Sequence, residues 1–520
     1  MEADYVIVGA GAAGSVLAYR LAEHGTVALV EAGGWIRSPV GRIPKAFYLL
    51  LQDARRTYRY PTSDGEGWIR GRAVGGSTAI NGLLYLRGEA DVFDDLARRT
   101  GEQAWAWPQM RQVFDRMETT PLPDGAGLSI ATTPAGGAVI ADVLRAASEL
   151  QVPTVADLNH ADGPRAGYAP GTIRAGKRRS AADAFLAPRR RTIRLLTHTR
   201  AQRVILEGTR AVAVEALRRG RGLTIRARRE VIVAGGAIES PLLLERSGIG
   251  AGPVLHAAGI RQLLDSPRVG EGLIEQRAIT LKARLAPGRG LGPHLDTWAK
   301  RLRAGAYHVL SGRGPLAAPA FEALALIAAG IPREGAGAKA VDAQVLFTPL
   351  LTDDTGLRVA REPGIIVQGF ALHPTSRGQV HITGPRAGDP PRITPRFLST
   401  DYDRAMASRI LHWQRELLAQ QPLSDQVREE LSPGVALRED GAIADFVRAS
   451  GAGIAHAVGS CAMGAEAEAV LDPQLRVRGL RGLRVIDASV FPSPPNGATA
   501  APTMALAWRG ADLIAGDGEE

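Results

Sequence analysis

The chain has 520 residues, of which 45% are hydrophobic and 5% aromatic, a balance typical of a globular protein. Its single cysteine, Cys461, excludes an intrachain disulfide framework and any zinc cluster built on cysteines. The formal charge of +10 comes mostly from arginine, yet no nucleic-acid motif or interleaved aromatic residue accompanies the basic runs. We predict no nucleic-acid partner and no metal site.

The N-terminus carries no recognisable targeting signal. It begins Met-Glu-Ala-Asp, which is acidic where a secretory signal is basic, and glycines break the apolar run that follows. The apolar run at residues 321–331 is shorter than the roughly 18 residues that a membrane span needs. We therefore expect a cytoplasmic protein without a membrane span.

The first elements in chain order are a strand at residues 5–8, a helix at 15–23 and a second strand at 27–30. The glycines between the first strand and the helix permit a tight turn, a close approach of a pyrophosphate to the helix N-terminus, and close helix–strand packing. An acidic residue ends the second strand, where it can accept hydrogen bonds from a ribose diol. This order predicts a dinucleotide site, and its position at the chain start favours FAD. The residues assigned to it are Gly9, Gly11, Ala12, Ala13, Gly14, Glu31 and Ala32.

Four further segments name a family. A second glycine-rich loop at residues 71–82 reads Gly-Arg-Ala-Val-Gly-Gly-Ser-Thr-Ala-Ile-Asn-Gly, and its N–H groups could face an anion or a flat ring. A buried strand that ends in Ala-Gly leads into residues 236–250, which read Gly-Ala-Ile-Glu-Ser-Pro and onward. Residues 456–464 and 483–492 complete the set. Together these segments resemble the signatures of the glucose–methanol–choline (GMC) oxidoreductases, from residue 4 to about residue 514.

The resemblance implies FAD held by the N-terminal unit together with returning segments of the chain. Some members of the family bind FAD covalently through a histidine at the position of Ile80, so we expect non-covalent FAD here. The further residues expected to contact FAD are Arg72, Val74, Gly76, Ser77, Asn81, Gly82, Val204, Ala234, Gly235, Asp487, Ala488, Pro502 and Thr503.

The resemblance also implies an α/β fold (α+β overall), in which a Rossmann-type FAD-binding domain is interleaved with a substrate domain of antiparallel sheet plus helices. The sheet is expected near residues 341–382 and the helices near 401–450. We assign to the FAD-binding domain residues 1–100, 195–275 and 450–515. We assign to the substrate-binding or cap domain residues 101–194 and 276–449.

The family chemistry transfers a hydride from an alcohol C–H to flavin N5 while a base removes the hydroxyl proton. A histidine suits that base because its pKa lies near working pH. His456 matches the active-site histidine of the family and lies in a glycine-rich, apolar stretch. We therefore expect a small-molecule alcohol as substrate and O2 or another electron acceptor. The identity of the alcohol, the acceptor and the oligomeric state stay open.

One loop departs from the family pattern. Most members place a second histidine or an asparagine beside the first, and the matching position here is Ala498, whose side chain cannot hydrogen-bond. Asn496 lies two residues earlier and could take its place if the loop shifts, so His456 and Asn496 are the candidate catalytic residues. The family's Asp-His pair at 275–276 is also replaced, by Glu-Gln. Either His456 works alone, or another side chain compensates, or the protein is an atypical member such as a lyase or photodecarboxylase.

Overall fold

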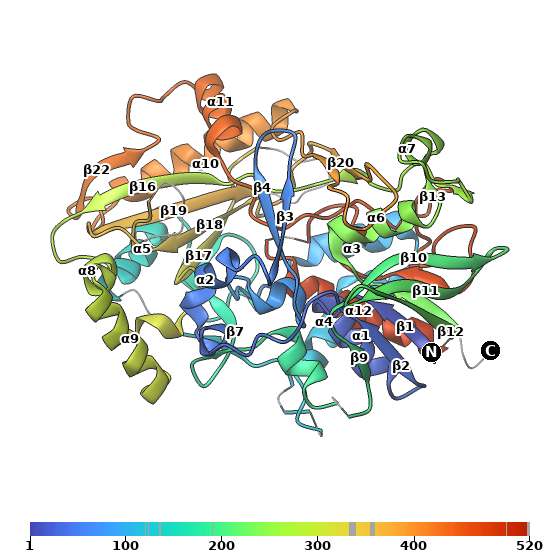
Figure 1. Ribbon diagram of the computed structural model, residues 1–520. Helices are drawn as coiled ribbons and strands as arrows, with labels where there is room; N and C mark the ends of the chain where they lie inside the picture. Colours follow the sequence, from blue (N-terminus) through green and yellow to red (C-terminus); the bar gives the residue numbers. More distant parts are fainter. Residues whose placement is uncertain are drawn as a thin grey trace.

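The computed structural model describes residues 1–119, 121–122, 124–134, 137–189, 191–331, 340–353, 359–495 and 497–516. Asn496, one of the candidate catalytic residues, lies outside the described residues. Figure 1 shows two sheet-based halves, with the N-terminus in one of them and the hairpin of β3 (Thr57–Pro61) and β4 (Gly67–Gly71) between the two.

The half that holds the N-terminus is built on a seven-stranded sheet. Its order is β10-β11-β12-β1-β2-β9, and β23 pairs with β12. The pairs β1–β2, β1–β12, β2–β9 and β12–β23 are parallel. The strands are β1 (Glu2–Val8), β2 (Val27–Val30), β9 (Arg194–Leu196), β10 (Thr199–Glu207), β11 (Arg210–Arg218), β12 (Arg221–Val233) and β23 (Leu483–Val485).

Strand β1 forms the centre of this sheet because its run of Val6, Ile7 and Val8 has no polar face and must be covered on both sides. The helices of this half are α1 (Ala12–Leu21), α4 (Trp107–Glu118), α6 (Gly236–Arg246) and α12 (Ala500–Gly516). Helices α1 and α12 pack against each other and share one hydrophobic core with β1 and α4.

The other half is built on a six-stranded sheet in the order β22-β16-β19-β18-β17-β6, and all its neighbouring pairs are antiparallel. One face packs on helices α5 (Gly137–Glu149) and α10 (Asp401–Ala419), with α11 (Asp440–Ser450) beside α10. The strands are β6 (Arg165–Tyr168), β16 (Ile279–Leu285), β17 (Ala323–Ile327), β18 (Ala343–Thr348), β19 (Gly364–Ala371) and β22 (Val427–Ser432).

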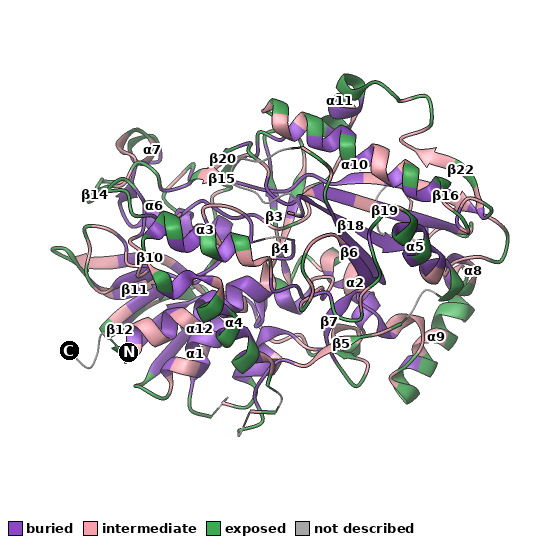
Figure 2. Cartoon of the chain, turned by 180° about the vertical axis from the view of Figure 1, so that it is seen from behind, coloured by how far each residue is buried: buried purple, intermediate pink, exposed green. Residues whose placement is uncertain are grey.

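Shorter elements connect and flank the two halves. The helices are α2 (Phe47–Gln52), α3 (Ala90–Thr100), α7 (Gly252–Ala257), α8 (Gly292–Leu295) and α9 (Trp298–Ser311). Small sheets join β3 (Thr57–Pro61) with β4 (Gly67–Gly71), β5 (Ile130–Thr132) with β7 (Pro170–Arg174) and β8 (Lys177–Arg178), β13 (Ile249–Gly250) with β14 (Leu264–Asp265), and β15 (Glu271–Leu273) with β20 (Gly378–His381) and β21 (Arg392–Thr394). Helix α9 is largely exposed (Figure 2).

The predicted fold class is confirmed, because a Rossmann-type sheet is interleaved with an antiparallel sheet and its helices. The antiparallel sheet is wider than expected, since strands as distant as residues 165–168 and 427–432 join it. The domain boundaries stay a prediction; helix α4, which we placed in the substrate domain, packs in the core around β1. In the described part of the chain, no helix combines the length and apolar character that a membrane crossing requires.

Candidate active site

The first glycine loop has the geometry that a dinucleotide requires. Gly9 has φ +106°, and a Cβ there would lie 2.3 Å from the carbonyl oxygen of Ala234. A Cβ on Gly14 would lie 1.8 Å from the carbonyl oxygen of Gly9, so helix α1 can pack on β1 only with glycine there. At Gly11 a Cβ would meet nothing closer than 3.9 Å. The protein itself leaves room at Gly11, as expected if a pyrophosphate fills it.

Helix α1 offers donors at that place. Its N-cap residue Gly11 has no capping side chain, so the N–H groups of Ala12 and Ala13 point from the helix start without a side-chain acceptor. Glu31 lies at the end of β2, where its carboxylate accepts from the N–H groups of Gly33 (2.7 Å) and Ala10 (3.0 Å). Burial raises the pKa of Glu31 to about 7, although these N–H groups stabilise the anion. Each carboxylate oxygen keeps a lone pair for a ribose hydroxyl.

The second glycine loop lies directly on the first. Gly75 donates from its N–H to the carbonyl oxygen of Ala10 at 2.7 Å, and a Cβ on Gly76 would lie 2.7 Å from the Cα of Gly11. Val74 is held by a 3.1 Å bond from its N–H to the carbonyl oxygen of Gly34. The two loops therefore form one glycine-lined cradle.

Several predicted contacts of this loop are engaged within the protein. The hydroxyl of Ser77 accepts from the N–H of Gly71 at 3.1 Å, and Arg72 lies 5.7 Å from the ring centre of Tyr58. Asn81 accepts hydrogen bonds through its side chain and its carbonyl from Arg178. Sequence reasoning missed Arg178, a buried cation whose pKa burial lowers to about 9, because no pattern marks it.

A pocket of about 530 Å³ adjoins this loop, and five of its lining residues are cations. They are Arg37, Arg42, Lys177, Arg178 and Arg179, together with a single acid, Asp183. Positive charge beside the cradle is compatible with an anionic cofactor such as FAD.

Most of the remaining predicted cofactor residues lie in segments that return to the FAD-binding half later in the chain. The N–H of Val204 donates to Ser247 Oγ at 2.8 Å, so a contact with adenine would have to use its carbonyl oxygen. The carboxylate of Asp487 accepts from the N–H of Gly236 (2.8 Å) and the hydroxyl of Ser240 (2.5 Å), so it fixes the start of α6. Three others lie beside these segments: Gly235 just before α6, and Pro502 and Thr503 in the first turn of α12. Ala234 and Ala488 follow β12 and β23, respectively, and Gly82 is the last residue of the second loop.

His456 is held by Glu275 and Gln276, the two residues that replace the family's Asp-His pair. Its backbone N–H donates to Glu275 Oε1 at 2.9 Å, and its Nδ1 lies 2.9 Å from Gln276 Oε1. Glu275 is paired in turn with Arg70 at 3.0 Å. The preceding residue, Ala455, has φ +69°, an uncommon backbone conformation that the surrounding bonds must hold.

The hydrogen bonds of Gln276 fix the tautomer of His456. Its Nε2 donates to the carbonyl oxygens of Ala371 (3.0 Å) and Leu372 (3.1 Å). Gln276 must therefore turn its oxygen to His456, and an oxygen can only accept. The proton of the neutral imidazole is consequently on Nδ1, and Nε2 carries the lone pair. Burial and the positive charge of Arg70 lower the pKa of His456 to about 3, so the ring is neutral at physiological pH.

Next to a ring that contacts His456, the structure shows a polar group that the sequence did not reveal. Phe370 packs edge-on against the His456 ring at 5.8 Å, and its cross-strand neighbour is Gln344. Gln344 is 0% exposed, and neither its Oε1 nor its Nε2 has a hydrogen-bond partner among the residues that the structure describes. Its Oε1 lies so close to Gly497 that a Cβ there would be 2.2 Å away. The side chain of Ala498, next in the chain, is buried and brings no polar atom.

The structure thus places two residues from distant segments against His456, Gln276 through a hydrogen bond and Phe370 through a ring contact, and Gln344 is the cross-strand neighbour of Phe370. The change from Asp-His to Glu-Gln at residues 275–276 was a signal that could have pointed to Gln276. Gln344 lies within a buried strand and has no sequence signal at all.

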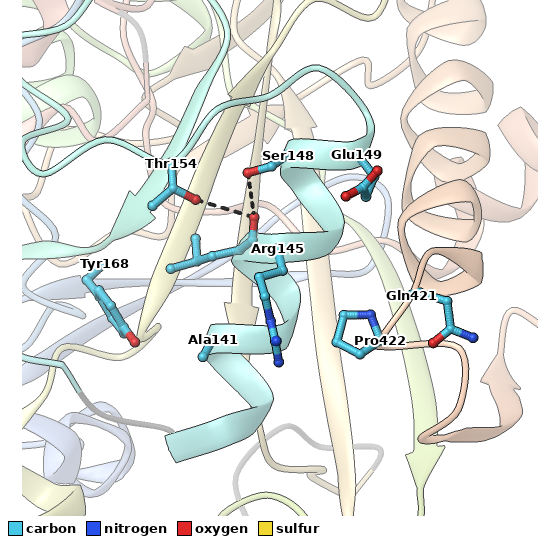
Figure 3. A pocket seen from close by; sticks show the side chains of 9 residues that line it. Ala141, Arg145, Ser148, Glu149, Thr154, Tyr168, Gln421 and Pro422 are labelled. Carbon is cyan, nitrogen blue, oxygen red and sulfur yellow. Dashed lines mark hydrogen bonds between the residues drawn. The ribbon is translucent and has the colours of Figure 1, made fainter.

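A large cavity lies over the same face of the six-stranded sheet, and its lining residues Gln368 and Ala452 are two residues from Phe370 and four residues from His456 along the chain. It has a volume of about 840 Å³ and is bounded by β16, β19, α2, α9 and α11. Figure 3 shows a different pocket, beside α5, where the hydroxyls of Ser148 and Thr154 both donate to the carbonyl oxygen of Leu144. That pocket contains none of the predicted site residues, and we place no chemistry there.

Comparison with known proteins gives consistent matches over almost the whole chain. Two sequence models described as GMC oxidoreductase match residues 3–277 and 374–507. The oxygen-dependent choline dehydrogenase of Vibrio vulnificus (strain YJ016) is 35% identical, over 98% of this chain and 94% of that protein. The enzyme of the same name from Pseudomonas syringae pv. tomato is 33% identical, over 99% of this chain and 94% of its own length.

Solved structures show the same architecture. Pyridoxine 4-oxidase from Mesorbium loti superposes with a TM-score of 0.86 at 30% identity, and 98% of each chain is covered. Formate oxidase superposes with a TM-score of 0.88 over 100% of this chain and 99% of its own, at 23% identity, which shows the shared fold alone.

Proposed function

Because this chain belongs to the GMC oxidoreductase family, we propose that it oxidises an alcohol to the carbonyl compound, with His456 as the base. The observation that carries this proposal is the fixed tautomer of His456, whose Nε2 lone pair is available for a hydroxyl proton. A positioned base of this kind contributes about 10²- to 10⁴-fold to the rate.

The cofactor of the chain is FAD. The glycine-lined cradle, the uncapped start of α1 and the carboxylate of Glu31 fit its pyrophosphate and ribose. We infer that it is held non-covalently, because Ile80 offers no nucleophilic atom. FAD, when bound, supplies the acceptor for the hydride that leaves the alcohol carbon.

The protein groups would act as follows. His456 Nε2 accepts the hydroxyl proton, and Gln276 stabilises the resulting imidazolium by accepting from Nδ1–H. Gln344 supplies the second polar group that Ala498 lacks, since its amide is buried next to Phe370 across the strand pair and has no partner in the described part of the chain. The burial of Phe370 and Ala498 around the site limits access of water. The electrons then pass to O2 or another acceptor.

The test is the anaerobic reduction of the bound flavin by a panel of primary and secondary alcohols. We expect at least one alcohol to bleach the flavin absorbance, and the variant His456→Asn to slow that reduction about 10²- to 10⁴-fold. The matched control is His160→Asn, an exposed histidine paired with Asp157, which should leave the rate unchanged. If no alcohol in a broad panel reduces the flavin, the proposal is wrong.

The buried Ala498, at the position of the family's second polar residue, favours a second candidate function, that of an atypical GMC-fold enzyme. A hydroxynitrile lyase would release cyanide from mandelonitrile without reducing the flavin, and a photodecarboxylase would release CO2 from fatty acids in light. Either activity in the absence of alcohol-driven flavin reduction would support this second candidate.

A further inference from the structure

We propose that the substrate of this enzyme is an amphipathic alcohol with an anionic end, whose charged group is held by Lys282 and Arg301 in the large cavity. This inference rests on the proposed alcohol oxidation at His456 and assigns the class of substrate. The relatives named above are choline dehydrogenases, and choline is a cation. The charged side chains that line the cavity of this chain favour an anion instead.

The cavity is large and mostly apolar. Its volume of about 840 Å³ is at the upper end of the range typical of small-molecule sites. Phe47, Phe321 and Phe446 lie in its wall together with many aliphatic side chains. Such a wall binds an alkyl or aryl body through the burial of apolar surface, at roughly 25 cal/mol per Å².

The charged groups of the wall are unbalanced. Among the described residues, the charged ones that line the cavity are Lys45, Lys282, Arg301 and Asp353, so three of these four are cations. Lys45 is neutralised by a 2.5 Å ion pair with the buried Glu322. Asp353 has an interaction of its own.

Lys282 and Arg301 are the two cations of the wall for which no ion pair has been described. The ammonium of Lys282 makes one long contact, 3.4 Å to the carbonyl oxygen of Thr352, and Arg301 donates through Nε to the carbonyl oxygen of Leu295. Within the described part of the chain, neither side chain has a carboxylate within 4.0 Å. A carboxylate or phosphate of a ligand would pair with the two positive charges, whereas these charges would repel a quaternary ammonium group.

The sheet register fixes the distance between the two ends of the substrate. Lys282 on β16 is opposite Ile366 on β19, and Phe370, which contacts His456, lies four residues further along β19. Four residues of a strand span about 13 Å. Between them, Gln368 faces the same cavity. The alcohol carbon and the anionic group of the substrate are therefore separated by a distance of this order.

Three alcohols of matched length test the inference on the FAD-loaded enzyme: 12-hydroxydodecanoate, its methyl ester, and (12-hydroxydodecyl)trimethylammonium. We expect kcat/KM for the acid to exceed that for the ester about 10- to 100-fold, the value of a charge-assisted contact. The cationic alcohol should be the poorest substrate. Equal use of the acid and the ester, or a preference for the cation, would overturn the inference while leaving alcohol oxidation intact.

Variants locate the anion site. Lys282→Met should raise KM for the acid about tenfold or more, with kcat and the kinetics of the ester unchanged, and Lys282→Glu should shift the preference toward the cation. The control Lys300→Met removes an exposed lysine that is paired with Asp296 and should change nothing. A loss that Lys282→Met causes equally for the acid and the ester would contradict the assigned role.

Binding without turnover separates this inference from the proposed function. Calorimetry with octanoate and octyltrimethylammonium needs no reaction at the flavin. Tighter binding of octanoate, weakened by Lys282→Met, supports the anion site even if no alcohol is oxidised. Absent octanoate binding, or tighter binding of the ammonium compound, contradicts it.

Discussion

At the scale of single residues, the environment of His456 determines over which pH range it can act. Burial and Arg70 lower its pKa to about 3, and a base is lost only when it becomes protonated. The acid limb of kcat/KM should therefore lie well below pH 6.5, the ordinary pKa of histidine. This neutral, oriented imidazole is what Gln276 maintains.

The variant Gln276→Glu tests that role. A carboxylate beside Nδ1 favours the imidazolium, so the pKa of His456 rises and the acid limb of kcat/KM moves toward neutral pH. The pH profile, followed by flavin reduction, measures the shift. Gln421→Glu adds the same charge at an exposed position and serves as the control. An unshifted acid limb in Gln276→Glu would show that the tautomer argument is wrong.

Replacing Gln344 should raise the stability of the protein and lower its activity. Two buried amide atoms that lack partners among the described residues cost the folded protein about 1 to 3 kcal/mol. Gln344→Met keeps the shape and removes that cost, so the denaturation midpoint of the FAD-free protein should rise, while kcat falls about tenfold. Retained kcat would count against a role for Gln344 in the reaction.

The matched control for this change is Gln414→Met. Gln414 is equally buried, but its Nε2 donates to the carbonyl oxygens of Ile279 and Val367. Its replacement strands these carbonyls and should lower the denaturation midpoint. The opposite signs of the two variants distinguish an unsatisfied amide from a structural one.

At the scale of elements, a cluster of one histidine and two carboxylates, of which Glu271 is exposed, fixes α6 to β20. His381 lies between Glu245 Oε1 (2.6 Å) on α6 and Glu271 Oε1 (3.0 Å) on β15. Hydrogen bonds and charge from Glu245 and Glu271 raise the pKa of His381 against the opposing effect of burial. The folded state therefore binds more protons than the unfolded state above pH 6.5, the unfolded value.

The sign of the pH effect follows from this proton count. The stabilisation from the cluster is complete below pH 6.5 and is lost as pH rises through the raised pKa of folded His381. Unfolding monitored from pH 6 upward should show that decline in the wild type and a flatter dependence in His381→Gln. His412→Gln, at an exposed pair with Asp440, should leave the slope unchanged. Equal slopes in wild type and His381→Gln would refute the assignment.

The elements also differ in how well the sequence predicted them. The unit β1–α1–β2 was predicted well because its apolar runs and its glycine spacing are local patterns within about thirty neighbouring residues. The width of the six-stranded sheet was not, because β6 and β22 join it through pairings with no local signal. Gln344 was missed for the same reason, since only the β18–β19 register brings it beside Phe370.

At the scale of the whole molecule, FAD links segments that are distant in sequence. The cradle combines Gly11 from the first loop with Gly76 from the second, and the returning segments come from β12, β23 and the start of α12. A ligand that binds only the folded chain stabilises it by RT ln(1 + [L]/Kd). FAD binding should therefore raise the melting temperature of the entire molecule.

The variant Glu31→Ala tests this linkage. FAD at 100 times its Kd should add about 2.7 kcal/mol to the free energy of unfolding of the wild type. If loss of the carboxylate weakens FAD binding about tenfold, the same FAD concentration adds about 1.4 kcal/mol, so the melting temperature rises less. Glu207→Ala, an exposed acid paired with Arg226, should behave as the wild type. An identical FAD-induced shift in Glu31→Ala would mean that Glu31 does not hold the cofactor, and the binding of its ribose would have to be reassigned.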